Sequence, residues 1–228
     1  VDLIAGNLGK NNLYNPSKER PVTMLAKDFD NNGAIDPVMF AYFKSNLEDD
    51  TYRPYPVNFW GDLMSQSPMF RKKFNYFREF ASTTKSGLFT QEELEGADEL
   101  MANHDQTTYF ENDGNGQFTM GELPWETQSA PIKCMITTNA GANAATDVLM
   151  IGNDFGNEAF IGRYDAFNGG VLLGDNKGGF DFKNAEESGF KVVGDAKDMV
   201  QVERANGGNP YIVVTQNRGK ALVFSKSE

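Results

Sequence analysis

Short apolar runs, each bounded by turn residues, follow one another along most of the chain. They cover residues 2–6, 22–27, 37–43, 107–111, 117–119, 133–137, 147–152, 170–173, 179–182, 198–203, 210–215 and 220–224. Runs of this length are typical of β-strands, and the Gly- and Asn-rich turns between them favour hairpins. The pattern therefore predicts a mainly β fold.

Residues 61–104 break this rhythm, because their apolar positions recur at helical spacing. Four phenylalanines repeat at steps of three and four residues: Phe70, Phe74, Phe77 and Phe80. Ser67-Pro68 fits the start of a helix, and apolar positions continue as far as Leu100-Met101. We predict a helical insertion between two strands of the β fold, with the aromatic stripe facing a core.

An internal repeat organises the predicted strands. A strand–loop–strand unit followed by a hairpin occurs in three copies: 22–43 with 109–118, 133–152 with 171–180, and a shorter one, 198–215 with 221–224. Repeats of four short strands are typical of propeller blades. Three copies together with the N-terminal strands give about three to four blades, so we expect one partial β-propeller domain over residues 1–228. Because the chain starts inside an apparent strand at Val1, we expect this domain to be cut from a larger propeller.

The acidic loop between residues 28 and 36 carries the clearest chemistry. Oxygen side chains stand at its first, third, fifth and ninth positions, and Gly33 supplies a sharp turn at the sixth. The predicted ligands are Asp28, Asp30, Asn32, the carbonyl of Ala34, and Asp36. Such a set of hard oxygen donors suits one Ca²⁺ ion.

Two other structures could also account for an acidic loop of this kind. An EF-hand loop starts in the same way, but it requires a bidentate Glu at position 12, where this chain has Met39, and helices on both sides. Both flanks here have the pattern of strands, so the EF-hand interpretation fails. An acidic turn without metal is the alternative that stays open.

The loop from Asp28 to Asp36 resembles the calcium loop of FG-GAP or VCBS repeats, which form the blades of integrin-type propellers. The segments 109–118 and 172–180 look like the outer hairpins of such repeats, and residues 6–9 and 161–165 also fit. The whole chain is similar to the C-terminal part of large secreted bacterial proteins of the ASPIC/UnbV type. The resemblance implies a propeller fold and calcium binding, but the motif is a weak indicator of any activity.

The corresponding loop of the second repeat departs from this pattern. Aligned on Asp147, it offers Asn139, Gly141 and Asn143 at the first, third and fifth positions. One carboxylate thus stands where the first loop has three, and the third repeat has only a plain turn at 206–209. We therefore expect a single calcium site.

Charge and composition narrow the range of partners. Lysine and arginine number 21 against 32 aspartates and glutamates, a net charge of −11, so nucleic acid is an unfavourable partner. No run approaches the roughly 18–20 apolar residues of a transmembrane segment. The only cysteine, Cys134, lies in an apolar run and is interpreted as a buried small hydrophobe, and the only histidine, His104, is interpreted as structural.

These observations favour a non-enzymatic module that serves binding, cell adhesion or scaffolding, stabilised by structural Ca²⁺. Arg163, Tyr164 and Asp165 form the candidate surface for a protein or glycan ligand, and open blade edges offer a route to self-association. Because weak calcium sites suit millimolar Ca²⁺, we expect an extracellular or cell-envelope location. The alternatives are the non-catalytic part of a secreted carbohydrate-active hydrolase and a spacer without ligand.

Overall fold

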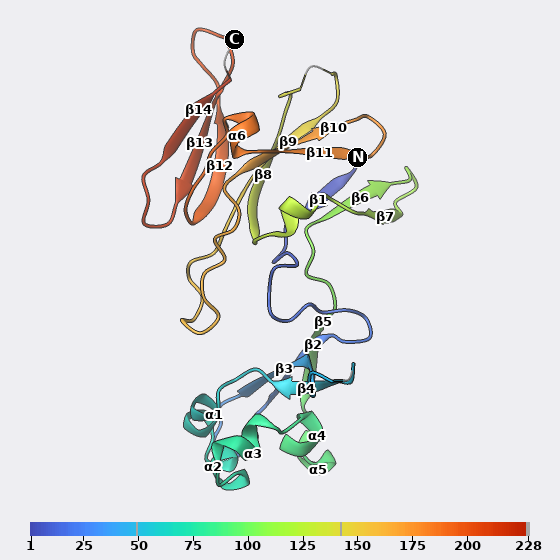
Figure 1. Ribbon diagram of the computed structural model, residues 1–228, viewed down its shortest axis with the longest axis vertical. Helices are drawn as coiled ribbons and strands as arrows, with labels where there is room; N and C mark the ends of the chain where they lie inside the picture. The colour runs from blue at the N-terminus through green and yellow to red at the C-terminus, as the bar shows by residue number, and fades with distance from the viewer. Residues whose placement is uncertain (49, 142, 227–228) are drawn as a thin grey trace. The chain divides into compact units, whose positions relative to one another are not determined.

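The computed structural model describes residues 1–48, 50–141 and 143–226. The chain divides into two compact units (Figure 1), called here unit 1 (Val1–Asn12 and Asp105–Glu228) and unit 2 (Leu13–His104). Unit 2 interrupts the sequence of unit 1 between strands β1 (Leu3–Ala5) and β6 (Thr108–Asn112), which pair with each other. The segment with the acidic loop therefore folds apart from most of the predicted repeats.

Unit 2 contains one four-stranded antiparallel sheet of order β4-β3-β2-β5. Its strands are β2 (Val22–Lys27), β3 (Asp36–Lys44), β4 (Tyr52–Pro56) and β5 (Asp98–Ala102). Five short helices lie between β4 and β5: α1 (Trp60–Gln66), α2 (Pro68–Lys73), α3 (Phe77–Ala81), α4 (Lys85–Leu88) and α5 (Gln91–Leu94). The helical spacing of the sequence thus corresponds to helices inserted between two strands of one sheet.

Aromatic side chains from the helices and the sheet form the core of unit 2. The fully or nearly fully buried members are Leu25, Val38, Phe40, Leu63, Phe70, Phe80, Leu88 and Phe89. Phe89 lies at the centre, because the rings of Phe29, Phe40 and Phe70 all contact it. Burial of this cluster supplies the main driving force that holds the short helices on the sheet.

Two details of the helical prediction are wrong. Leu100 and Met101 belong to the exposed strand β5, because they pair with β2. The phenylalanine stripe does not run along one helix face, because the backbone is extended at Phe74, between α2 and α3. As a result Phe70 and Phe80 are buried, whereas Phe77 is 60% exposed.

Unit 1 contains three antiparallel sheets. The N-terminal sheet has the order β1-β6-β7, the middle sheet β11-β10-β9-β8 and the C-terminal sheet β12-β13-β14. The remaining strands are β7 (Phe118–Gly121), β8 (Ile132–Thr138), β9 (Asp147–Gly152), β10 (Gly170–Gly174), β11 (Phe180–Asn184), β12 (Ala196–Val202), β13 (Tyr211–Gln216) and β14 (Leu222–Ser225). Two short helical turns complete the unit: η1 (Trp125–Gln128) and α6 (Ala185–Ser188).

The predicted repeats correspond to these sheets only in part. The second copy forms the middle sheet and the third forms the C-terminal sheet. The first copy is wrong, because residues 22–43 lie in unit 2 while 109–118 lie in unit 1, next to β1. The fold is mainly β, and each described sheet is open at both edges.

The outer hairpins of two sheets have the same internal structure. In the β6–β7 turn, Asp113 Oδ1 accepts hydrogen bonds from the amides of Asn115 and Gln117. In the β10–β11 turn, Asp175 Oδ1 accepts from the amides of Lys177 and Gly179. The two hairpins are therefore structural repeats, with β6 equivalent to β10 and β7 equivalent to β11.

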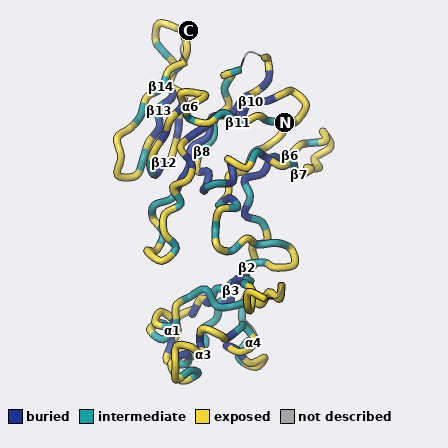
Figure 2. The backbone as a smooth tube through the Cα atoms, viewed as in Figure 1, coloured by how far each residue is buried: buried dark blue, intermediate teal, exposed yellow. Residues whose placement is uncertain are grey.

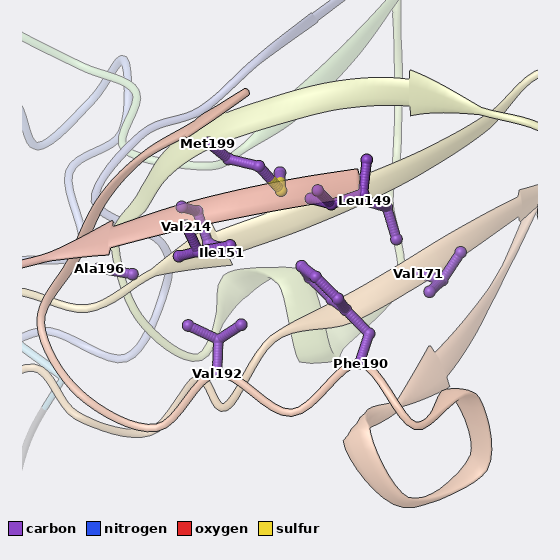
Figure 3. Close-up of a cluster of buried hydrophobic side chains, with 9 residues drawn as sticks. Leu149, Ile151, Val171, Phe190, Val192, Ala196, Met199 and Val214 are labelled. Atoms are coloured by element: carbon purple, nitrogen blue, oxygen red, sulfur yellow. The ribbon is translucent and has the colours of Figure 1, made fainter. Parts of the chain in front are cut away.

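The middle sheet packs against other elements on both of its faces, and every residue of its inner strand β9 is buried (Figure 2). We call the face with Val148, Met150 and Leu172 its front face; it packs with Ile4 and Tyr109 of the N-terminal sheet. Its opposite, back face packs on the C-terminal sheet. Figure 3 shows that cluster, with side chains from β9, β10, β12 and β13. The buried members of the cluster are Leu149, Ile151, Val171, Phe190, Val192, Ala196, Met199, Ile212 and Val214.

Tyr109 links the start of the chain to the β6 strand. Its hydroxyl donates to Asp2 Oδ2 at 2.9 Å, and burial together with the Asp2 carboxylate raises the pKa of Tyr109 to about 12. A pKa raised in the folded state stabilises the fold below the unfolded pKa of about 10, and this stabilisation is lost as the pH rises through 12.

We therefore expect Tyr109→Phe to lower the free energy of unfolding by about 1–2 kcal/mol at neutral pH. The variant should lose less stability than the parent between pH 10 and pH 12. Denaturant melts at a series of pH values measure both effects. Equal losses in the two proteins over that interval would contradict the assignment.

Candidate metal centre

The acidic loop joins β2 to β3 at one end of the unit 2 sheet. Asp28 directly follows β2, and Asp36 is the first residue of β3. Left-handed backbone conformations at Asn31 and Gly33 (φ 58° and 89°) turn the chain sharply between them. Asparagine and glycine tolerate this conformation better than other residues, which explains their positions in the loop.

Hydrogen bonds within the loop fix its shape. Asp28 accepts from the amides of Asn32 (3.0 Å) and Gly33 (2.7 Å), one on each carboxylate oxygen. Asn32 Oδ1 accepts from the amide of Ala34 at 2.8 Å. Asp36 Oδ2 accepts from the amide of Phe29 at 3.0 Å, which ties the start of the loop to its end. The loop is therefore ordered by its own side chains.

Three carboxylates converge inside this loop. Asp28, Asp30 and Asp36 each place an oxygen atom within 4.8 Å of the other two. Asp36 is buried, and Asp28 and Asp30 are half-buried. Asp30 Oδ1 is buried and finds no hydrogen-bond partner among the described residues. A buried carboxylate oxygen without a donor is unfavourable unless a cation or a proton compensates it.

Burial and the closeness of the three carboxylates affect the pKa of Asp36 in particular. Burial raises the pKa of Asp36, and the negative charges of Asp30 and Asp28 raise it further. The pKa of Asp28 is lowered, first by the hydrogen bond from the amide of Gly33. The neighbouring Lys27 forms no ion pair with these carboxylates, because its ammonium donates to backbone carbonyls of Glu93 and Glu95. In the parts of the chain that the structure describes, no ion pair includes a member of the triad.

Ser67 belongs to this centre, although the loop pattern alone does not point to it. Its fully buried hydroxyl donates to Asp30 Oδ2 at 2.8 Å and accepts from the amide of Met69 as the N-cap of α2. The Ser67-Pro68 pair marked a helix start in the sequence, but its contact with the loop depends on tertiary structure. One carboxylate oxygen of Asp30 is thereby held by the helix, and the other has no hydrogen-bond partner among the described residues.

The residues present fit a divalent cation of the calcium type. Ca²⁺ takes oxygen ligands, and the three carboxylates supply negative charge at one point. The other two predicted ligands, Asn32 and the carbonyl of Ala34, lie in the exposed turn of the loop, and their part in the site stays a prediction. The structure thus brings together Asp28, Asp30 and Asp36 as a group that could hold a metal ion.

The equivalent loop before β9 satisfies its single carboxylate with backbone amides. Asp147 is fully buried, and its two oxygens accept from the amides of Gly141 (2.7 Å) and Gly174 (3.0 Å). Asn143 donates to the carbonyl of Gly174 and accepts from the amide of Ala145. Backbone amides therefore satisfy both oxygens of this buried carboxylate.

The predicted partner surface lies in the connection between β9 and β10. The Tyr164 backbone pairs with Asp154, and its side chain packs against the cluster between the N-terminal and middle sheets. The Arg163 guanidinium lies 5.0 Å from the centre of the Phe155 ring. Asp165 is exposed. Arg163 and Asp165 are therefore accessible, whereas Tyr164 contributes to packing.

Cys134 is half-buried, whereas the sequence predicted a buried residue, and its thiol is hydrogen-bonded. Its Sγ donates to Asp198 Oδ1 at 3.4 Å and to the carbonyl of Met199 at 3.7 Å. Burial raises the pKa of the Cys134 thiol, whereas a nucleophilic cysteine needs a lowered pKa.

Comparisons with protein-family models, with curated proteins and with solved structures found no match for this chain. The part of the chain that the structure describes has no helix long and apolar enough to cross a membrane. What the structure defines is a mainly β protein of stacked antiparallel sheets, with a helix-bearing inserted unit and an acidic loop.

Proposed function

We propose that the chain is a calcium-stabilised, non-enzymatic binding or scaffolding module of a secreted or cell-surface protein, built from propeller-type blades. The observation that carries this proposal is the convergence of Asp28, Asp30 and Asp36, whose ligand oxygens lie within 4.8 Å of one another, together with a buried Asp30 oxygen that has no hydrogen-bond partner among the described residues. The ion would act structurally, by neutralising three carboxylates that the fold forces together. Accessible Arg163 and Asp165 are the candidate contacts for a protein or glycan ligand.

A calcium site of this kind stabilises the folded state by mass action. A ligand present at a hundred times its dissociation constant adds about 2.7 kcal/mol to the free energy of unfolding. Loops with few protein ligands bind at about 10⁻⁴–10⁻³ M, which suits the Ca²⁺ concentration outside cells. The proposed location, extracellular or in the cell envelope, follows from this match.

The experiment is a thermal melt of the 228-residue chain in EDTA and in millimolar Ca²⁺, with heat of binding measured in parallel. We expect Ca²⁺ to raise the melting temperature of unit 2, and Asp30→Asn to abolish both the shift and the heat. Without Ca²⁺ the variant should be at least as stable as the parent, because one repelling charge is removed. Trp60, which contacts Phe80 in the core of unit 2, reports the transition by fluorescence.

Asp62→Asn is the matched control, because Asp62 is an exposed carboxylate of unit 2 outside the loop. This variant removes the same charge and should keep the full calcium shift. The proposal fails if the parent melts at the same temperature with and without Ca²⁺, or if Asp62→Asn loses the shift as completely as Asp30→Asn.

A further inference from the structure

The C-terminal sheet has an exposed apolar face. Its alternate residues Met199, Ile212 and Val214 pack on the middle sheet, so the residues between them point to the opposite side. The members of this second face are Val200, Val202, Tyr211, Val213 and Val223. Val200, Val213 and Val223 form one row across the three strands, and Val200 and Val223 are 53% and 62% exposed.

The N-terminal sheet has a second exposed apolar face. Ile4 and Tyr109 pack on the middle sheet, and the neighbouring residues point away from it. Leu3, Phe110 and Met120 form one row across β1, β6 and β7, and Phe118 lies beside this row. Leu3 is 52% and Met120 63% exposed. Two clustered apolar faces on one unit are more than scattered surface hydrophobes.

The two faces are not of the same kind, and the hairpin equivalence shows why. Aligning Asp113 with Asp175 makes Phe110 equivalent to Leu172 and Phe118 equivalent to Phe180. Leu172 and Phe180 belong to the front of the middle sheet, which packs on its predecessor. The exposed face of the N-terminal sheet is therefore a front face.

The exposed face of the C-terminal sheet is a back face, because its other face packs on the preceding sheet, as a front face does. Within unit 1 the back of the N-terminal sheet packs on the front of the middle sheet, for example through the rings of Tyr109 and Phe180, 5.2 Å apart. The back of the middle sheet packs in turn on the front of the C-terminal sheet. One front face and one back face remain uncovered. Inside the chain every front face that is covered packs on a back face, so these two exposed faces are of the types that pack together.

We propose that the chain associates head to tail with a second copy of itself, the back of its C-terminal sheet packing on the front of the partner's N-terminal sheet. The contact would continue the back-to-front stacking already repeated twice in unit 1. In this contact the two sheets pack face to face and do not pair through their open strand edges. Such a contact is heterologous, and two copies that each use both faces form the smallest closed assembly. The inference does not depend on the calcium site.

The test measures the mass of the chain by light scattering and by sedimentation over a range of concentrations. We expect a species of twice the 25.3 kDa chain mass. Val223→Asp on the back face and Met120→Asp on the front face should each lower the association constant by about a hundredfold or more, since each buries an unpaired charge. Leu47→Asp, at a 97% exposed position of unit 2, is the control and should leave the mass unchanged.

Mixing the two variants distinguishes a head-to-tail contact from a symmetric one. Met120→Asp chains keep an intact back and Val223→Asp chains an intact front, so a mixture should recover one good interface and form heterodimers. Circular dichroism and melting temperature confirm that each variant is folded. A parent that stays a monomer overturns the proposal. So does an oligomer that survives either substitution, or a mixture of folded variants that shows no recovery.

Discussion

Replacing Phe40 with alanine is expected to lower the free energy of unfolding of unit 2 by about 3–5 kcal/mol. Phe40 is fully buried on the central strand pair of the sheet, and its ring contacts Phe89, around which the aromatic core is arranged. The helices of unit 2 have four to seven residues each and depend on that core, because helices this short are not stable alone. A cavity at Phe40 should therefore loosen the helices together with the sheet.

Calorimetry and Trp60 fluorescence measure this effect. The transition of unit 2 should move to lower temperature, while the sheets of unit 1 keep theirs. Phe77→Ala is the matched control, because Phe77 is 60% exposed and its truncation leaves no cavity. A comparable loss in both variants would show that the core does not have the arrangement described.

Asn153→Ala is expected to destabilise unit 1 by about 3 kcal/mol or more. The Asn153 side chain is almost fully buried directly after β9, and it makes three hydrogen bonds to backbone groups. Its Nδ2 donates to the carbonyls of Phe167 (2.7 Å) and Gly194 (2.9 Å), and its Oδ1 accepts from the Phe167 amide (3.0 Å). Alanine leaves two buried backbone groups of Phe167 and the half-buried carbonyl of Gly194 without this partner, and each buried group costs about 1–3 kcal/mol.

The backbone at Asn153 is left-handed (φ 81°), so part of any loss could come from strain on alanine. Asn176→Ala isolates this part, because Asn176 has φ 60° in an exposed turn. Denaturant unfolding of both variants should give a small loss for Asn176→Ala and a several-fold larger one for Asn153→Ala. Similar losses would assign the effect to strain and refute the role of the hydrogen bonds.

The middle sheet could be predicted from the sequence because its four strands are consecutive and its turns carry strong local signals. The hairpin at 174–179 is stabilised by Asp175 within five residues, so tertiary structure adds little to it. The N-terminal sheet could not be predicted in the same way. Leu3 pairs with Phe110, and all of unit 2 lies between these two residues in the sequence. No local sequence pattern indicates a pairing partner at that separation.

The acidic loop was predictable for the same reason, since all three carboxylates lie within nine residues. The contribution of Ser67 was not, because it reaches Asp30 from 37 positions away. The sequence pattern places residues 98–102 in the helical stretch, because Leu100 and Met101 are apolar at helical spacing from Leu94. Pairing with β2 decides their conformation instead, as a neighbouring strand edge outweighs a weak helical preference.

The way unit 2 interrupts the N-terminal sheet has a consequence for the order of folding. In the unfolded chain, Asp2 and Tyr109 are 107 positions apart, so joining β1 to β6 closes a long loop. Once unit 2 has folded, Val22 and Ala102 are already paired, and 27 positions remain in that loop, 20 from Asp2 to Val22 and 7 from Ala102 to Tyr109. A roughly fourfold shorter loop lowers the entropic cost of closure by about 1.2 kcal/mol. Folding of unit 2 first, aided by any ion in its acidic loop, would therefore make the first and sixth strands easier to join.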